Sequence, residues 1–91
     1  MRTIAAESII NKLTKSYNKI NILNHNDDEI TIDAEESPED RDGFPIFNYW
    51  NEDYTENYYI FGVRKHLHNF LERNGWYAEW VNSYTIALYK F

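Results

Sequence analysis

Carboxylates and aromatic rings alternate along residues 42–61, and these are the side chains of this sequence best suited to recognition chemistry. The stretch DGFPIFNYWNEDYTENYYIF holds eight aromatic residues in twenty positions. Tyr and Trp offer large, rigid contact area with a hydrogen-bonding end, and they dominate the hot spots of protein interfaces. Carboxylates around such rings attract a basic partner and reject an acidic one. The pattern fits a contact surface, and it fits equally a core-wrapping segment with solubilising acids.

If the stretch is a contact surface, its residues divide into charges and anchors. The expected charges are Asp40, Asp42, Glu52, Asp53 and Glu56. The expected anchors, which lose their water on binding, are Trp50, Tyr54 and Tyr58. Three rings without a polar group are expected in the core instead: Phe44, Phe47 and Phe61.

The net charge of −6 is unevenly distributed along the chain. Twelve of the fifteen acids lie in residues 27–56, which contain one base, Arg41, so that this segment carries −11. Blocks of like charge mark interaction surfaces or solvated loops. Because phosphate contacts supply most of the affinity for nucleic acids, a net acidic chain is not expected to bind nucleic acid directly.

Other residue types in the chain could perform chemistry, but their spacing does not support it. His66 and His68 diverge by about 200° on a helix, and the pair His68 and Glu72 has no third ligand. Pro38 interrupts the acidic run of residues 33–42, and Gly43 comes too late for a calcium loop. No nucleophile motif or phosphate-binding glycine loop occurs. We therefore expect no enzyme activity, no metal site and no cofactor.

The N-terminal third has the pattern of a helix followed by a hairpin. Five apolar residues recur at helical spacing and form one stripe: Ala6, Ile9, Ile10, Leu13 and Tyr17. Thr3 can cap a helix that starts at Ile4 and ends near residues 17–18. Residues 20–23 and 29–34 have strand patterns on either side of the turn sequence NHNDD.

The C-terminal third repeats this order of elements. A second helix is predicted from about Tyr58 to Asn74-Gly75, where Gly provides the left-handed C-cap residue. Its expected apolar face consists of Ile60, Val63, Leu67, Phe70 and Leu71. Residues 76–81 and 85–91 then flank a second hairpin turn. Residues 44–50 could add a short strand, although Pro45 favours an edge or an extended loop.

These elements predict an α+β fold in which two helices pack on one face of a four- to five-stranded, mainly antiparallel sheet, in the order α-β-β-(β)-α-β-β. Residues 1–91 fit a single domain. Residues 35–57 form an acidic aromatic insert between two helix–hairpin units, and its first part, EESPEDRDG, is expected to be a mobile loop. Without a signal peptide, Cys or a membrane-length apolar run, the chain is expected to be cytoplasmic.

The C-terminal half resembles a pattern found in small uncharacterised phage and prophage proteins. The segments DGFPIFNYW, YYIFGV, LERNGWYAEW and TIALY follow the order GxPxFxY, FGV and LExxGW of those proteins across residues 42–89. Their final turn often reads Tyr-Asp-Ala-Gly-Thr, whereas this chain has VNSYT at residues 81–85. The resemblance implies a phage source, and it brings neither an activity nor a catalytic residue.

Two functions from different classes follow from these observations. The first is a protein-binding module, in its most concrete form a phage-encoded inhibitor that occupies a basic, nucleic-acid-binding surface of a host or phage protein by imitating the charge of a phosphate backbone. The second is a self-assembling structural or accessory protein. In that homo-oligomer, the basic helix face formed by Lys12, Lys15 and Lys19 would dock on the acidic insert of a neighbouring copy.

Overall fold

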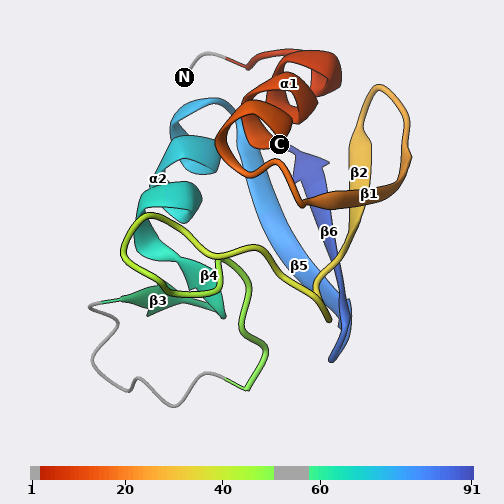
Figure 1. Cartoon of the computed structure of the whole chain (residues 1–91). Coiled ribbons are helices and arrows are strands. Elements are labelled where there is room, and N and C mark those ends of the chain that lie inside the picture. The colour runs from red at the N-terminus through yellow and green to blue at the C-terminus, as the bar shows by residue number, and fades with distance from the viewer. Residues whose placement is uncertain (1–2, 51–57) are drawn as a thin grey trace.

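Within the described part of the chain, the regular structure consists of two helices, two long hairpins and one short hairpin (Figure 1). The computed structural model describes residues 3–50 and 58–91. Along the chain the elements are α1 (Ala6–Ser16), β1 (Asn21–His25), β2 (Glu29–Asp33), β3 (Tyr59–Ile60), β4 (Val63–Arg64), α2 (Lys65–Arg73), β5 (Trp76–Asn82) and β6 (Thr85–Lys90).

The main sheet joins the two long hairpins through their second strands. Its strand order is β1-β2-β6-β5, and every neighbouring pair is antiparallel. In the central pair, Ile30 lies opposite Leu88 and Ile32 lies opposite Ile86. Because side chains alternate between the faces of a sheet, this register places four large aliphatic residues on one face. The predicted α+β class with an antiparallel sheet is confirmed.

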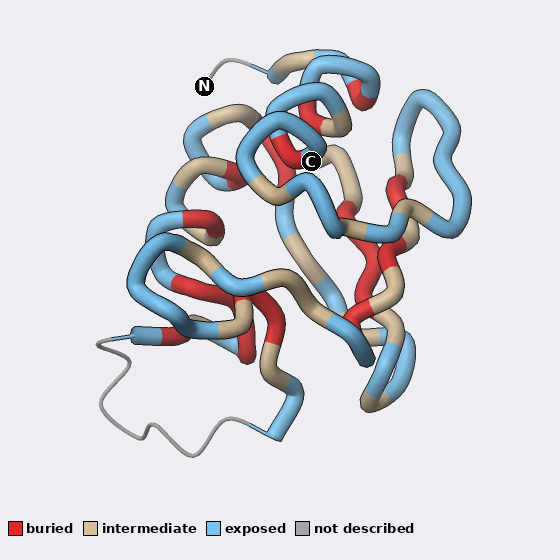
Figure 2. The backbone as a smooth tube through the Cα atoms, viewed as in Figure 1, coloured by how far each residue is buried: buried red, intermediate tan, exposed pale blue. Residues whose placement is uncertain are grey.

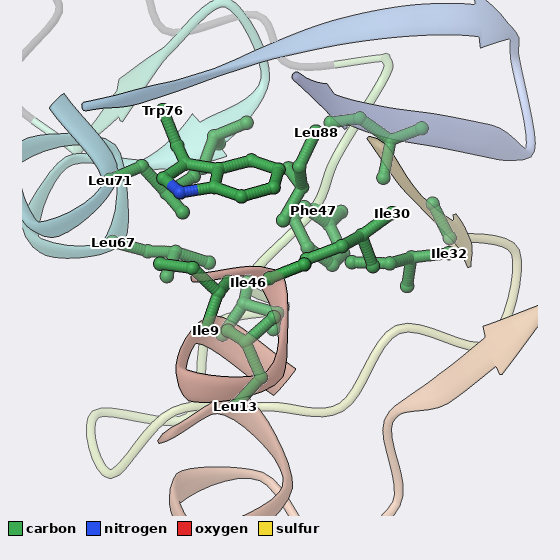
Figure 3. Packing of buried hydrophobic residues seen from close by; sticks show 14 residues of the cluster. Ile9, Leu13, Ile30, Ile32, Ile46, Phe47, Leu67, Leu71, Trp76 and Leu88 are labelled. Atoms are coloured by element: carbon green, nitrogen blue, oxygen red, sulfur yellow. The ribbon is translucent and has the colours of Figure 1, made fainter. Parts of the chain in front are cut away.

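Both helices pack on that aliphatic face, as predicted. Ile9 and Leu13 of α1, together with Leu67 and Leu71 of α2, belong to the same buried cluster as the aliphatic residues of β2 and β6. Figure 2 shows the buried backbone positions concentrated where the helices meet the sheet. Trp76, which is fully buried, lies among these side chains (Figure 3). The core therefore closes between one layer of helices and one layer of sheet.

The prediction that the second helix begins near Tyr58 is wrong. Tyr59 pairs with Arg64 and Ile60 pairs with Val63 in the two-stranded sheet β3–β4, and α2 starts only at Lys65. The turn consists of Phe61 and Gly62, which have φ angles of 52° and 76°. Two consecutive residues with positive φ are typical of the tight hairpin turn whose twist matches that of the strands. Because two residues with left-handed backbone conformation cannot continue a right-handed helix, the helical spacing of the apolar residues in this stretch is misleading.

The predicted start of the first helix is also wrong, and the two alternatives left open for residues 44–50 are now decided. The first helix begins at Ala6, and its N-cap position is Ala5, which makes no side-chain cap. Thr3 instead packs against Gly75 at the end of α2. Residues 44–50 contribute isolated bridges, at Pro45 and Phe47, rather than a strand. Because Pro45 cannot donate to a strand ladder, the chain there continues as an extended loop.

The phenylalanines expected in the core divide between two environments. Phe47 is buried as predicted, whereas Phe44 is 39% exposed and Phe61 is 81% exposed. Phe61 is exposed because it occupies the tip of the β3–β4 turn. Tyr59, in contrast, is buried, and its hydroxyl donates a hydrogen bond of 2.7 Å to the carbonyl oxygen of Pro45.

Among the described residues, neither helix has the length and apolarity required to cross a lipid bilayer. Their lengths of 11 and 9 residues suit the small helical layer over the sheet.

We expect Gly62→Ala to destabilise the fold more than Gly43→Ala. Both glycines have positive φ, which costs an L-residue about 1–2 kcal/mol. A Cβ at Gly62 would also lie 2.7 Å from the backbone oxygen of Asn48, whereas a Cβ at Gly43 would meet nothing within 4 Å. Overpacking of this kind adds about 1–3 kcal/mol. Urea unfolding of both variants measures the difference, and equal losses of stability would contradict the close approach at Gly62.

Candidate functional site

A groove lined by carboxylates and aromatic rings lies beside the tip of the β5–β6 hairpin. It has a volume of about 440 Å³. We call it the acidic aromatic groove, and its lining includes Glu35, Glu36, Asn48, Tyr49, Trp50 and Tyr84. Both glutamates are exposed to solvent. The groove therefore presents two negative charges next to three rings, a combination that suits a positively charged side chain.

The rings of this groove lie on the surface but contact one another. Trp50 is 74% exposed, and Tyr84 is 53% exposed. The Tyr49 ring packs edge-on against Trp50, with centroids 5.0 Å apart, and against Trp80, with centroids 5.3 Å apart. The Nε1 group of Trp80 in turn donates a hydrogen bond of 2.7 Å to the carbonyl oxygen of Phe61. These contacts connect the groove to the exposed turn of β3–β4.

Backbone hydrogen bonds hold the chain before the groove rings against the core. The N–H of Ile46 donates to the carbonyl oxygen of Pro38 at 2.9 Å, and the N–H of Phe47 donates to Oγ of Ser37 at 3.0 Å. The side chains of Ile46 and Phe47 are both buried. Trp50 follows three residues later, so its position depends on this anchored segment.

A buried ion pair fixes the loop at residues 40–44. Oδ2 of Asp40 accepts a hydrogen bond of 2.5 Å from Nε of Arg64 and lies 3.1 Å from Nε2 of His66. Oδ1 of Asp40 accepts the backbone N–H groups of Asp42 and Phe44 at 3.0 and 3.1 Å. The side chains of Arg64 and Asp40 are only 8% and 4% exposed. One carboxylate thus closes the loop and links it to the start of α2.

Aromatic rings surround the guanidinium group of this pair. Cζ of Arg64 lies 4.7 Å from the ring centroid of Phe44, and the Phe44 ring stacks on Tyr58 with centroids 5.5 Å apart. The remaining nitrogens of Arg64 donate to the carbonyl oxygen of Tyr58 at 3.2 Å and to Oδ2 of Asp42 at 3.5 Å. A desolvated cation is stabilised by such ring faces and by several acceptors together.

The environment of Asp40 stabilises its ionised form. Burial alone raises the pKa of a carboxyl group, but hydrogen bonds from His66, Arg64 and the backbone of Phe44, together with the charge of Arg64, outweigh burial. The pKa of Asp40 is lowered from 3.8 to about 2. The group is therefore charged in the folded protein at any pH above about 3.

The four predicted contact residues that the structure describes fall into three groups. Asp40 lies inside the fold, where its carboxylate serves Arg64, so it cannot act as a contact charge on the surface. Asp42, with a side chain 64% exposed, and Tyr58, 53% exposed, lie together around Arg64. Trp50 lies in the acidic aromatic groove. Four predicted contact residues lie outside the described part of the chain: Glu52, Asp53, Tyr54 and Glu56.

Sequence reasoning omitted the other residues of this groove from the contact set. The sequence predicts that Glu35 and Glu36 lie in a mobile loop, although the acidic run that contains them indicates a charged surface. Tyr84 belongs to the turn of the distant C-terminal hairpin, and its carbonyl oxygen accepts the N–H of Ala34 at 2.9 Å. That neighbourhood depends on the pairing of β2 with β6, which no local pattern in the sequence specifies.

The two histidines of α2 have separate partners, as their spacing predicts. His66 faces Asp40, whereas Nε2 of His68 lies 3.2 Å from Oε2 of Glu72 one turn later. Across residues 3–50 and 58–91, no three His, Cys, Asp or Glu side chains are grouped so that they could hold a metal ion.

Comparisons with protein-family models, with curated proteins and with solved structures found no match for this chain. The resemblance to phage proteins gains no support from them, and the geometry described above is the basis for the functional argument.

We predict that Asp40→Asn destabilises the protein by about 3 kcal/mol, because the Arg64 charge loses its buried counter-ion. Because Asn can still accept hydrogen bonds from the backbone N–H groups of the loop, the substitution tests the effect of the charge alone. Asp42→Asn is the matched control, since its carboxylate is exposed and 3.5 Å from Arg64, and it should cost under about 1 kcal/mol. Denaturant unfolding measures both values. Similar losses in the two variants would show that the buried pair has no special role.

Low pH should reduce the unfolding free energy of the wild-type protein, because it protonates the Asp40 carboxylate. Because the pKa of Asp40 is lower in the folded protein than in the unfolded chain, its contribution is complete above about pH 4 and is lost as pH falls through about 2. The shift corresponds to about 2 kcal/mol at neutral pH. Unfolding free energies measured between pH 6 and pH 2 should therefore fall less steeply for Asp40→Asn than for the wild type. Parallel pH profiles would contradict this assignment.

Proposed function

We propose that this protein is a binding module that occupies a basic surface of a partner protein. The observation that carries the proposal is the acidic aromatic groove, in which Trp50 and Tyr84 are exposed beside the carboxylates of Glu35 and Glu36. Large rings that remain exposed next to charge are typical of interface anchors.

The chemistry of the groove favours an arginine or lysine side chain as its ligand. A guanidinium group can pair with a carboxylate through two parallel hydrogen bonds while its flat face stacks on Trp or Tyr. Each cation–π contact contributes about 0.5–1 kcal/mol at an exposed site. Glu35 and Glu36 would supply the counter-charge, and Trp50 would supply the ring. An acidic ligand would meet repulsion at the same place.

A second cluster extends the acidic and aromatic character of the surface. Asp42 and Tyr58 are exposed around the buried Arg64, and the Phe44 ring stacks on Tyr58. The sequence that directly follows Trp50 contains three more acids, at residues 52, 53 and 56, which lie outside the described residues. A partner with several basic residues could therefore engage more than one point of this surface.

The more specific form of the proposal is a phage-encoded inhibitor that covers the nucleic-acid-binding surface of a host protein. The net charge of −11 in residues 27–56 supports this form, because nucleic-acid-binding surfaces are rich in Lys and Arg. Asp40 takes no part in it, since that carboxylate is buried against Arg64.

The proposal predicts binding to basic nucleases that weakens with salt. We expect affinity, measured by calorimetry against a panel of basic nucleases, to fall at least about tenfold between 50 mM and 500 mM salt, because screening shortens the reach of surface charges. The double variant Glu35→Gln and Glu36→Gln, and separately Trp50→Ala, should weaken binding at low salt.

Glu79→Gln on the outer face of β5 provides the control, because Glu79 is exposed but does not line the groove. An affinity that does not change with salt concentration would contradict the proposal that the protein imitates the charge of a phosphate backbone. Equal effects of Glu79→Gln and the groove variants would place the binding surface elsewhere.

A further inference from the structure

A second groove, of opposite character, lies between the two helices and the loop that Asp40 closes. Its volume is about 860 Å³. We call it the basic groove, and its lining includes Lys12 and Lys15 of α1, Arg41 of the loop, and Leu67, Phe70 and Arg73 of α2. Nζ of Lys12 lies 6.0 Å from the ring centroid of Phe70. The groove thus combines an apolar floor with cations on its rim.

The cations of this groove have no acidic partner among the described residues. Lys12, Lys15, Arg41 and Arg73 are four of the nine Lys and Arg residues in the chain. None of them forms an ion pair within residues 3–50 and 58–91, although the chain carries fifteen acids. Lys15 and Arg73 lie in the last turns of their helices, where they favour the helix dipole, but Arg41 lies in a loop and has no such role.

The acids that also line the basic groove do not cancel this charge. Asp40 pairs with Arg64 and His66, and Oδ2 of Asp42 lies 3.5 Å from Arg64, which does not line the groove. Glu39 is the remaining acid of the lining. The lining therefore contains four cations but only one carboxylate, that of Glu39, that has no cation close to it. Such a groove favours an acidic ligand that also has an apolar part.

We propose that the basic groove docks the acidic aromatic groove of a second copy of this chain. Glu35 and Glu36 would face the rim cations, while Trp50 or Tyr84 would enter over Phe70. The two grooves match in both charge and apolar surface, and they are different surfaces of the molecule, so the contact is head-to-tail. The net charge of −6 opposes association at long range, but at physiological salt the Debye length is about 8 Å and local pairs decide.

A charge-swap experiment tests this contact directly. One variant carries Lys12→Glu and Lys15→Glu, so both of its grooves are acidic at the contact. The other carries Glu35→Lys and Glu36→Lys, so both of its grooves are basic. All four positions are exposed, so both variants should retain the fold, which circular dichroism checks. Sedimentation velocity at physiological salt, up to about 1 mM protein, measures association.

We expect the wild type to sediment faster as its concentration rises, and each variant alone to associate at least about tenfold more weakly. An equimolar mixture of the two variants should associate again. The matched control mixes Lys19→Glu, Lys65→Glu with Asp27→Lys, Glu79→Lys, which change net charge equally but lie outside both grooves. Each control variant alone should associate like the wild type, because both of its grooves are unchanged. If a control variant alone associates as weakly as the groove variant of equal net charge, net charge and not the proposed contact is responsible.

Three results would overturn the inference: a wild type that stays monomeric throughout, groove variants that associate like the wild type, or a groove-swap mixture that stays monomeric while both variants are folded. None of these results bears on the proposed function, because binding to a basic nuclease needs the acidic aromatic groove alone. Conversely, loss of nuclease binding would leave the head-to-tail contact intact.

Discussion

The ion pair between Asp40 and Arg64 is the constraint on which the surface of this protein depends. Arg64 sits at the N-cap position of α2 and also ends β4, so it joins the helix to the short hairpin. Asp40 reaches it from the loop 24 residues earlier in the chain and uses its other oxygen to close that loop. A buried charge pair contributes less net stability than its geometry suggests, because both groups lose water. Its value here lies in specifying one arrangement of loop, hairpin and helix.

This arrangement fixes the surface that the proposed function requires. The loop that contains Asp40 continues through Ile46 and Phe47, whose buried side chains and backbone hydrogen bonds fix its path to Trp50. The same loop supplies Arg41 to the basic groove. Binding that does not require ordering of the site avoids an entropy cost of about 0.5–1.5 kcal/mol per immobilised side chain. A small domain with a thin core gains from such preparation, since it has little stability in reserve.

Periodicity was sufficient to predict the fold class, the first helix and both long hairpins, because their apolar faces repeat at 3.6 or 2 residues. It failed at residues 58–64, where Ile60 and Val63 fit a helical face although the left-handed pair Phe61 and Gly62 forces a hairpin. Asp42, Trp50 and Tyr58 are exposed as the pattern suggests. The sequence does not distinguish the buried Asp40 from the exposed acids beside it. Its burial depends on Arg64, 24 positions away, and a local sequence pattern contains no information about that contact.

The distribution of aromatic rings between core and surface connects the fold to the proposed binding function. The main buried cluster is mostly aliphatic and includes only two aromatic residues, Phe47 and Trp76. Within the described ranges, eight of the ten exposed large apolar side chains are aromatic. Phe61 is the extreme case, because it keeps an unfavourable positive φ and yet remains 81% exposed. A core that closes mainly with Ile, Leu and Val leaves most of these rings on the surface, and exposed rings beside carboxylates are the feature on which the proposed binding function depends.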